Sequence, residues 1–308
     1  MLKRYAAATS LGMLLLLVSG VLVTTTGSAA GCGNAWPFCD GDWSSLATWI
    51  EVNHRLVTGV LGLMVASLSI LAWRAHREDR DVRWMAGASV FFLLLQSWLG
   101  AAAVMWGSTP AVLATHFGVS LAAFGAVFLL GVRLDQLEGR HACLRGPVSP
   151  AFHRAVWGGL ALTMVVVYAG AYLRHTHAGL ACLGWPLCGA TPIPPPGTPA
   201  FLGLLHRLLA GLLLLVVAYA GHLARRFRHE RPDLFAGSVA ALGLLVAQAL
   251  SGALVIATRS SIAANVLHSA LLIVFAASLL YLGLQITPQP APRRQEAPQV
   301  GPVAPSRH

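Results

Sequence analysis

Eight long apolar segments constrain this chain more than any other feature of its sequence. Only 10% of the 308 residues are charged and 56% are hydrophobic, whereas a soluble globular domain carries about 25% charged residues. Each segment is close to the ~20 residues that a helix needs to cross a bilayer, and only helices or closed barrels can span lipid. We therefore predict an all-α membrane protein with eight transmembrane helices. The predicted spans are residues 5–26, 52–73, 84–105, 111–132, 154–173, 201–222, 234–256 and 264–284.

The first apolar segment admits a second interpretation. It has a charged start, an apolar core and a run of small residues that ends at Cys32, which is also the pattern of a secretory signal peptide. However, the segment is long enough to span the bilayer, and Cys32 has a counterpart at Cys182, where no cleavage is conceivable. We therefore expect an uncleaved first helix.

The basic residues are distributed unevenly between the segments that connect the predicted helices. The net charge is +10, and 17 of the 21 basic residues lie at the N-terminus, in segments 74–83, 133–154 and 225–231, and in the C-terminal tail. Alternate loops are thus rich and poor in arginine, as the positive-inside rule describes for membrane proteins. The charge therefore indicates membrane topology rather than nucleic-acid binding. It predicts that both termini are cytoplasmic and that two cysteine-containing loops face outward.

The chain repeats itself at a nearly constant interval. The loop "GCGNAWPFCDG" at 31–41 resembles "LACLGWPLCGA" at 180–190, with an offset of 149–150 residues. An offset of 152 relates four further pairs: His54 and His206, Gln96 and Gln248, Gly100 and Gly252, and His116 and His268. A regular offset over separate segments indicates an internal duplication.

The duplication predicts two tandem four-helix bundles. Because each bundle contains an even number of helices, both enter the membrane in the same orientation, which makes a parallel pseudo-twofold repeat. We expect an N-terminal half at 1–140, a cytoplasmic linker at 141–153 and a C-terminal half at 154–285. The Pro-rich tail at 286–308 is expected to be disordered.

Four of the 12 histidines lie within the apolar segments, namely His54, His116, His206 and His268. An ionisable group inside a membrane is costly and marks function by default, although a single histidine can simply hydrogen-bond a neighbouring helix. All four occur within about two turns of the outer helix ends, so each half carries two at equal depth on different helices. Such a pair suits a haem with two axial histidines. Zinc fits less well because further ligands are lacking, and a proton relay would not require matched depth.

Four arginines lie at or near the outer ends of the helices that carry these histidines. Arg55 and Arg207 follow the repeated histidines, and Arg174 and Arg259 add positive charge at the outer rim. These arginines could pair with haem propionates or reach toward the membrane surface.

Glu51 lies three residues before His54, on the same helix face. The position 152 residues later is Gly203, so only the first half carries this acid. A carboxylate near a metal-bound substrate can accept a proton, although an acid at a helix entry can also act through the helix dipole. We expect the first half to perform chemistry and the second to hold a permanent redox cofactor.

With these residues assembled, the chain resembles the haem A synthase family over nearly its whole length, to about residue 285. The resemblance rests on "EVNHR" at 51–55, the cysteine-bracketed loop at 32–39, His116, "LHR" at 205–207 and His268. It implies a bacterial form in the cell inner membrane, since no transit peptide is evident.

The family resemblance implies oxidation of the C8 methyl of haem O to a formyl group through an alcohol, with oxygen from water. His54 and His116 would hold the substrate haem, His206 and His268 would ligate a haem b cofactor, and Glu51 would be catalytic. The implied partners are haem O, a haem O synthase, and a membrane quinone or another electron acceptor, and a homo-oligomer is left open. The family also implies a disulfide Cys32–Cys39, whereas the second cysteine pair occurs in only part of the family. We expect Cys182–Cys188 as the repeated copy of the first disulfide, because both loops face an oxidising compartment.

Several alternatives stay open at this point. Reversible thiol chemistry could take place at the first cysteine loop, and Cys143 is interpreted as a spare thiol. A di-haem electron carrier linked to quinone could use the same four histidines, but it leaves Glu51 unexplained. A haem transporter rests only on the repeat, and it predicts broken helices at the membrane midplane.

Overall fold

The computed structural model describes residues 1–107, 109–138 and 148–287, and these residues form eight long helices with no strand among them. All eight are long and apolar enough to cross a membrane, which confirms the predicted all-α membrane fold. They are α1 (Leu2–Thr25), α2 (Leu46–Ala75), α3 (Arg80–Met105), α4 (Pro110–Leu137), α5 (Pro150–His175), α6 (Pro199–Ala224), α7 (Pro232–Ala257) and α8 (Ile262–Ile286).

Several helices begin before the apolar segment that predicted them, because polar residues cap them. The side chain of Ser45 accepts a hydrogen bond from the N–H of Ala47 at the start of α2, six residues before the predicted start at 52. Thr109 and Thr198 cap α4 and α6 in the same way, and each precedes a proline at the first helical position. As a consequence, Glu51 and His54 both lie inside α2.

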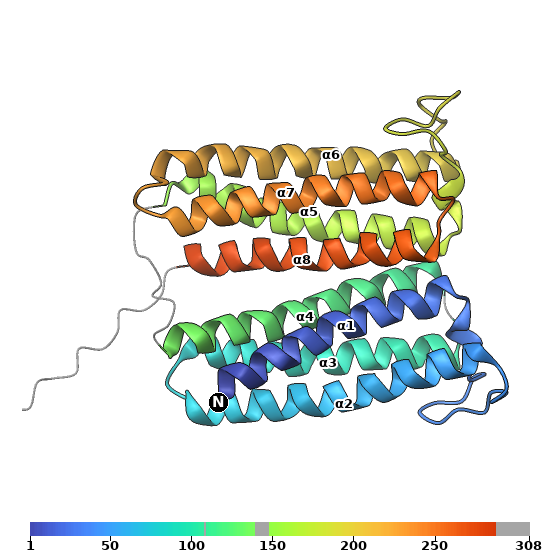
Figure 1. Ribbon diagram of the computed structural model, residues 1–308, viewed down its shortest axis with the longest axis horizontal. Helices are drawn as coiled ribbons and strands as arrows, with labels where there is room; N and C mark the ends of the chain where they lie inside the picture. The colour runs from blue at the N-terminus through green and yellow to red at the C-terminus, as the bar shows by residue number, and fades with distance from the viewer. Residues whose placement is uncertain (108, 139–147, 288–308) are drawn as a thin grey trace, which may run out of the picture.

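The helices are arranged as two groups in sequence order, with α1–α4 on one side and α5–α8 on the other (Figure 1). The fully buried apolar residues likewise form two clusters, one drawn mainly from each group. The groups meet where α4 packs on α5 and α8 and where α1 packs on α8. Arg174 of α5 crosses this boundary and donates to the carbonyl of Val21 at 3.1 Å and to Thr24 Oγ1 at 2.8 Å. The tandem repeat and the predicted domain limits stay inferences from the sequence.

Both cysteine loops emerge at the same end of the bundle, on the right of Figure 1 and opposite the N-terminus. Each loop begins with a residue at positive φ, Gly27 (+70°) or His177 (+56°), followed by a short 3-10 turn, η1 (Ser28–Ala30) or η2 (Ala178–Leu180). At the other end, ion pairs tie helices together, with Lys3 to Asp135 at 3.3 Å and Arg133 to Asp79 at 2.6 Å.

Candidate functional site

Each of the four intramembrane histidines packs against a glycine of the preceding helix. Their helices are α2, α4, α6 and α8, and all four imidazoles are half-buried. A Cβ atom added to the glycine would lie within 3.4 Å of the imidazole Cε1 in every case, and at Gly170 the added atom would be so close that the ring or the helix must shift. The four contacts are Gly20 with His54 at 3.4 Å, Gly100 with His116 at 3.2 Å, Gly170 with His206 at 2.7 Å, and Gly252 with His268 at 3.3 Å.

The structure brings these histidines together as two pairs. His54 is close enough to His116 to interact electrostatically, and His206 is equally close to His268. Within the described ranges, no three His, Cys, Asp or Glu side chains gather into a metal-binding cluster. The donor set is therefore two imidazoles per half.

Hydrogen bonds divide each pair into two kinds of histidine. Ser19 Oγ lies 2.8 Å from His54 Nδ1, and Ser251 Oγ lies 2.8 Å from His268 Nδ1. By contrast, the Nδ1 atoms of His116 and His206 are buried and have no side-chain partner among the described residues. Their imidazoles lie beside the backbone carbonyls of Gln96 and Val166 instead. Neither Ser19 nor Ser251 was predicted from the sequence, although each directly precedes one of the glycines that contact a histidine.

Two of these observations test whether the pairs suit a haem iron. A glycine contacts each of the four imidazoles, and two of the rings have a buried Nδ1 with no side-chain partner among the described residues. A pair of neutral imidazoles on separate helices is the donor set that a haem with two axial histidines requires. The residues therefore fit such a group.

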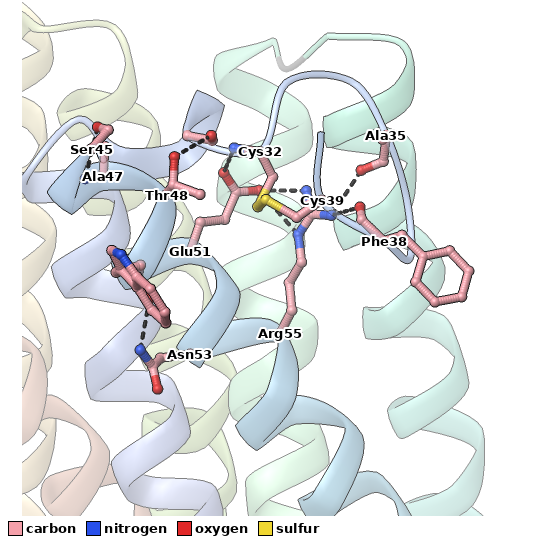
Figure 2. Close-up of a disulfide and its surroundings, with 12 residues drawn as sticks. Cys32, Ala35, Phe38, Cys39, Ser45, Ala47, Thr48, Glu51, Asn53 and Arg55 are labelled. Carbon is pink, nitrogen blue, oxygen red and sulfur yellow. Dashed lines mark hydrogen bonds and ion pairs between the residues drawn. A yellow bond between two sulfur atoms is a disulfide. The ribbon is translucent and has the colours of Figure 1, made fainter. Parts of the chain in front are cut away.

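Glu51 is a buried carboxylate that links α2 to the first cysteine loop. Only 3% of the residue is exposed. Figure 2 shows its carboxylate between the backbone nitrogen of Cys32 and the guanidinium group of Arg55. Oε2 accepts from the Cys32 N–H at 2.9 Å, and Oε1 accepts from Arg55 Nε at 3.1 Å and Nη2 at 2.5 Å. The sequence placed Glu51 beside His54, but it did not indicate these partners.

In the second half, Gly203 replaces this acid, and its backbone packs directly beneath the second loop. A Cβ at Gly203 would lie 3.0 Å from the Cβ of Cys182. Arg207 Nη2 donates directly to the carbonyl of Cys182 at 2.6 Å. Among the described residues, Arg207 is the charged side chain that bonds the second loop, whereas both Arg55 and the carboxylate of Glu51 bond the first.

Arg55 and Arg207 hold the loop carbonyls, a role that the sequence did not predict. Arg55 Nη1 donates to the carbonyls of Ala35 at 2.7 Å and Phe38 at 2.8 Å (Figure 2). Arg207 Nη1 donates to Gly184 at 2.6 Å and Leu187 at 3.2 Å. Their predicted contact with haem propionates stays a prediction.

The other two predicted cofactor-binding arginines lie in different surroundings. Arg174 bonds to α1, as described above, and also lies close enough to His268 to interact electrostatically. Arg259 lies in the turn between α7 and α8 with φ +48°. It occupies the repeat position of Gly107, whose φ is +81°.

Both predicted disulfides are present. The Cys32–Cys39 and Cys182–Cys188 bonds have Cα–Cα distances of 4.6 Å and χ3 angles of −95°. Cys32 and Cys182 are fully buried. Cys143 lies outside the described residues.

Comparison with known proteins gives concordant matches over most of the chain. The COX15-CtaA family model, described as "Cytochrome oxidase assembly protein", matches residues 42–280. "Heme A synthase" of Geobacillus kaustophilus (strain HTA426) is 40% identical over 273 residues, which cover 87% of this chain and 86% of the relative. The protein of the same name from Geobacillus thermodenitrificans is 37% identical over 272 residues, covering 87% and 86%. That from Bacillus cereus (strain 03BB102) is 37% identical over 285 residues, covering 91% and 92%.

Proposed function

The chain belongs to the COX15-CtaA family of cytochrome oxidase assembly proteins, and on this premise we propose that it is a haem A synthase. Its reaction oxidises the C8 methyl group of haem O to a formyl group in two two-electron steps. Overall, the methyl group and one water give the formyl group, four protons and four electrons. The electrons pass to a membrane quinone or another acceptor. The observation that carries the proposal is the buried acid Glu51, which stands near only one of the two histidine pairs.

We assign the two histidine pairs to different groups. His54 and His116 hold the iron of the substrate, because Glu51 lies one helical turn before His54. His206 and His268 would hold haem b, which supplies reversible one-electron redox chemistry when bound. The second half needs no acid for that task, and Gly203 stands at the corresponding position.

Glu51 has the capacity to accept a proton in addition to its structural contacts. An ionised carboxylate has about four lone-pair sites, and the described donors, the Cys32 N–H and two nitrogens of Arg55, occupy three of them. The fourth can bind the water that supplies the formyl oxygen and take its proton as the water adds. Arg55 fixes the orientation of the carboxylate through two bonds to Oε1.

The disulfide loops are proposed to lie on the outer face of the cell inner membrane, with both termini in the cytoplasm. Support comes from the arginine-rich segments, which alternate with the cysteine-containing ones. An oxidising compartment also favours both disulfides.

A second candidate is a di-haem electron carrier with four structural histidines. The matching glycine contacts at all four imidazoles favour it, because they make the two pairs similar. It gives no role to the acid that is present in one half only.

The deciding experiment is expression of the intact protein in a strain that makes haem O, followed by chromatography of the extracted haems. Haem A, or the hydroxylated intermediate, is expected with the wild-type protein and not with an empty membrane control. Unchanged haem O together with a protein-bound haem b spectrum would overturn the synthase in favour of the electron carrier.

A further inference from the structure

One histidine of each pair is supported by a serine hydroxyl from a neighbouring helix, and the other is not. Ser19 of α1 reaches His54, and Ser251 of α7 reaches His268, each at 2.8 Å from Nδ1. Each serine is followed by the glycine that contacts the same imidazole, Gly20 or Gly252. In each Ser-Gly dipeptide, the serine hydroxyl contacts the imidazole, and the glycine allows the helix backbone to pack closely against the same ring.

The hydroxyl proton determines the tautomer of these two histidines. Ser19 Oγ donates to the carbonyl of Leu16 at 2.8 Å, and Ser251 Oγ donates to the carbonyl of Gln248 at 2.7 Å. A serine hydroxyl has a single proton, so with that proton on the carbonyl, Oγ accepts a hydrogen bond from Nδ1–H. A neutral imidazole with its proton on Nδ1 carries its free lone pair on Nε2.

An independent contact agrees with this assignment at His268. The side-chain amide nitrogen of Gln248 lies 3.2 Å from His268 Nε2. An amide nitrogen can only donate, so Nε2 accepts and carries no proton. Both contacts of His268 are therefore met by one tautomer, in which the Nε2 lone pair accepts from the Gln248 amide. Iron can bind to this nitrogen only when that amide moves away.

The equivalent positions at the other two histidines cannot form this bond. Leu99 precedes Gly100, and Ala169 precedes Gly170, and neither side chain carries a polar atom. In agreement, the buried Nδ1 atoms of His116 and His206 have no side-chain hydrogen-bond partner among the described residues, and only the backbone carbonyls of Gln96 and Val166 lie beside these rings. The serine-bonded histidine does not occupy the same position in the two halves. It is His54, the first of its pair, in the N-terminal half and His268, the second of its pair, in the C-terminal half.

We propose that Ser19 and Ser251 are positioning residues that fix Nε2 of His54 and His268 as the iron-binding nitrogen and make these two the more tightly bound ligands. His116 and His206 are the weaker ligand of each pair. The inference rests on the proposed function only in taking haem as the ligated group. Hydrogen bonds to the outer nitrogen of a ligating histidine are typically worth about 10–100-fold in metal affinity.

The test uses the purified full-length protein with its haem b and follows haem transfer to excess apomyoglobin by absorbance. Ser251→Ala is expected to release haem about 10–100-fold faster than wild type, and Ser251→Thr, which retains the hydroxyl, to restore slow release. Ser238→Ala is the matched control on the same helix, since Ser238 is buried and its hydroxyl bonds to the Leu234 carbonyl. It should release haem at the wild-type rate.

A gain-of-function variant protects the test against simple misfolding. Ala169→Ser places a hydroxyl at the position equivalent to Ser19, next to His206 Nδ1, which has no side-chain partner among the described residues. This variant should release haem more slowly than wild type. Equal release from Ser251→Ala and Ser238→Ala, or no slowing in Ala169→Ser, would overturn the proposal. Wild-type protein that takes up no haem b would also overturn it. If haem release is slow and depends on the serine, but the protein forms no haem A, the inference about the serines holds and the proposed synthase function is refuted.

Discussion

The carboxylate of Glu51 accepts a hydrogen bond from the backbone N–H of Cys32 at 2.9 Å, which joins the proposed catalytic acid to the disulfide loop above it. Arg55 completes the link, since it donates both to Glu51 and to the loop carbonyls of Ala35 and Phe38. Acid, arginine and disulfide therefore form one hydrogen-bonded unit. A substitution in this unit can therefore affect both haem A formation and the structure of the first cysteine loop, and the two effects must be measured separately.

Glu51→Gln makes that separation for the acid. The glutamine retains an oxygen that can accept from the Cys32 N–H, but it cannot take up a proton as a carboxylate does. Its amide nitrogen cannot accept from Arg55, so Arg55→Ala serves as the control for loss of that contact. We expect haem A formation to fall by about 10²–10⁴-fold, the usual contribution of a general base, with the haem b spectrum unchanged. Glu51→Ala should also abolish activity and, in addition, speed reduction of Cys32–Cys39 by dithiothreitol. Full activity in Glu51→Gln would contradict a catalytic role for Glu51.

Each loop arginine should stabilise only the cysteine loop whose carbonyls it hydrogen-bonds. Arg55→Ala removes hydrogen bonds to the first loop and Arg207→Ala removes those to the second. Loss of one charge-assisted hydrogen bond of about 1.5 kcal/mol corresponds to roughly tenfold easier opening. Hydrogen exchange of the loop amides, followed by mass spectrometry, measures this for both loops in one sample. Equal exchange of both loops in either single variant would rule out separate clamps.

Gly170 provides the tightest test of the glycine contacts. A Cβ there would lie 2.7 Å from Cε1 of His206, so Gly170→Ala must displace the imidazole or the helix. We expect the haem b content of the purified protein to fall severalfold while the helix content by circular dichroism is retained. Gly158→Ala is the matched control on the same helix, because its added Cβ meets no described atom within 4 Å. The prediction is wrong if the two variants bind equal amounts of haem b.

Asp79, just before α3, should make stability depend on acid pH. Burial acts to raise the pKa of its carboxyl, but hydrogen bonds from the Arg133 side chain and the Val82 N–H outweigh it, so the pKa lies below the usual 3.8. A carboxyl whose pKa is lower in the folded state stabilises that state above the unfolded pKa, and the contribution disappears as the pH falls through the folded pKa.

Thermal unfolding of the detergent-solubilised protein between about pH 6 and pH 3 measures this contribution. Wild type should be more stable than Asp79→Asn at pH 6, and the difference should shrink toward pH 3. Parallel pH profiles for the two proteins would show that the Asp79–Arg133 pair contributes no pH-dependent stability.

The histidine ligands illustrate how far sequence reasoning extends toward the site. His54, His116, His206 and His268 were identified because an ionisable side chain inside an apolar helix is unusual and because the repeat aligns them in pairs. The structure places each pair close together. The contacting glycines could also have been noticed, since Gly100 and Gly252 share the same offset as the histidines.

The arginines show where that reasoning stops. Contact of Arg55 and Arg207 with haem propionates stays a prediction. Apart from Glu51 at Arg55, their described partners are loop carbonyls 17 to 25 residues distant in the sequence, which were not predicted. The direction of a carbonyl in an irregular loop depends on the backbone path, which residue spacing does not encode. The same holds for the bond from Cys32 to Glu51.

The eight membrane helices could be predicted from the sequence and are present in the structure. A shared depth for the four histidines and an acid confined to one half were also predicted from it, and these two stay predictions. These follow from properties that are local along the chain, because apolar length sets a bilayer crossing and a repeat offset sets equivalent positions. Only the tertiary structure decided that Ser19 and Ser251 support one histidine of each pair and that Arg55 holds Glu51 beneath the disulfide. These contacts depend on how neighbouring helices are rotated against each other and on how a loop folds back, and both are fixed by packing between distant segments.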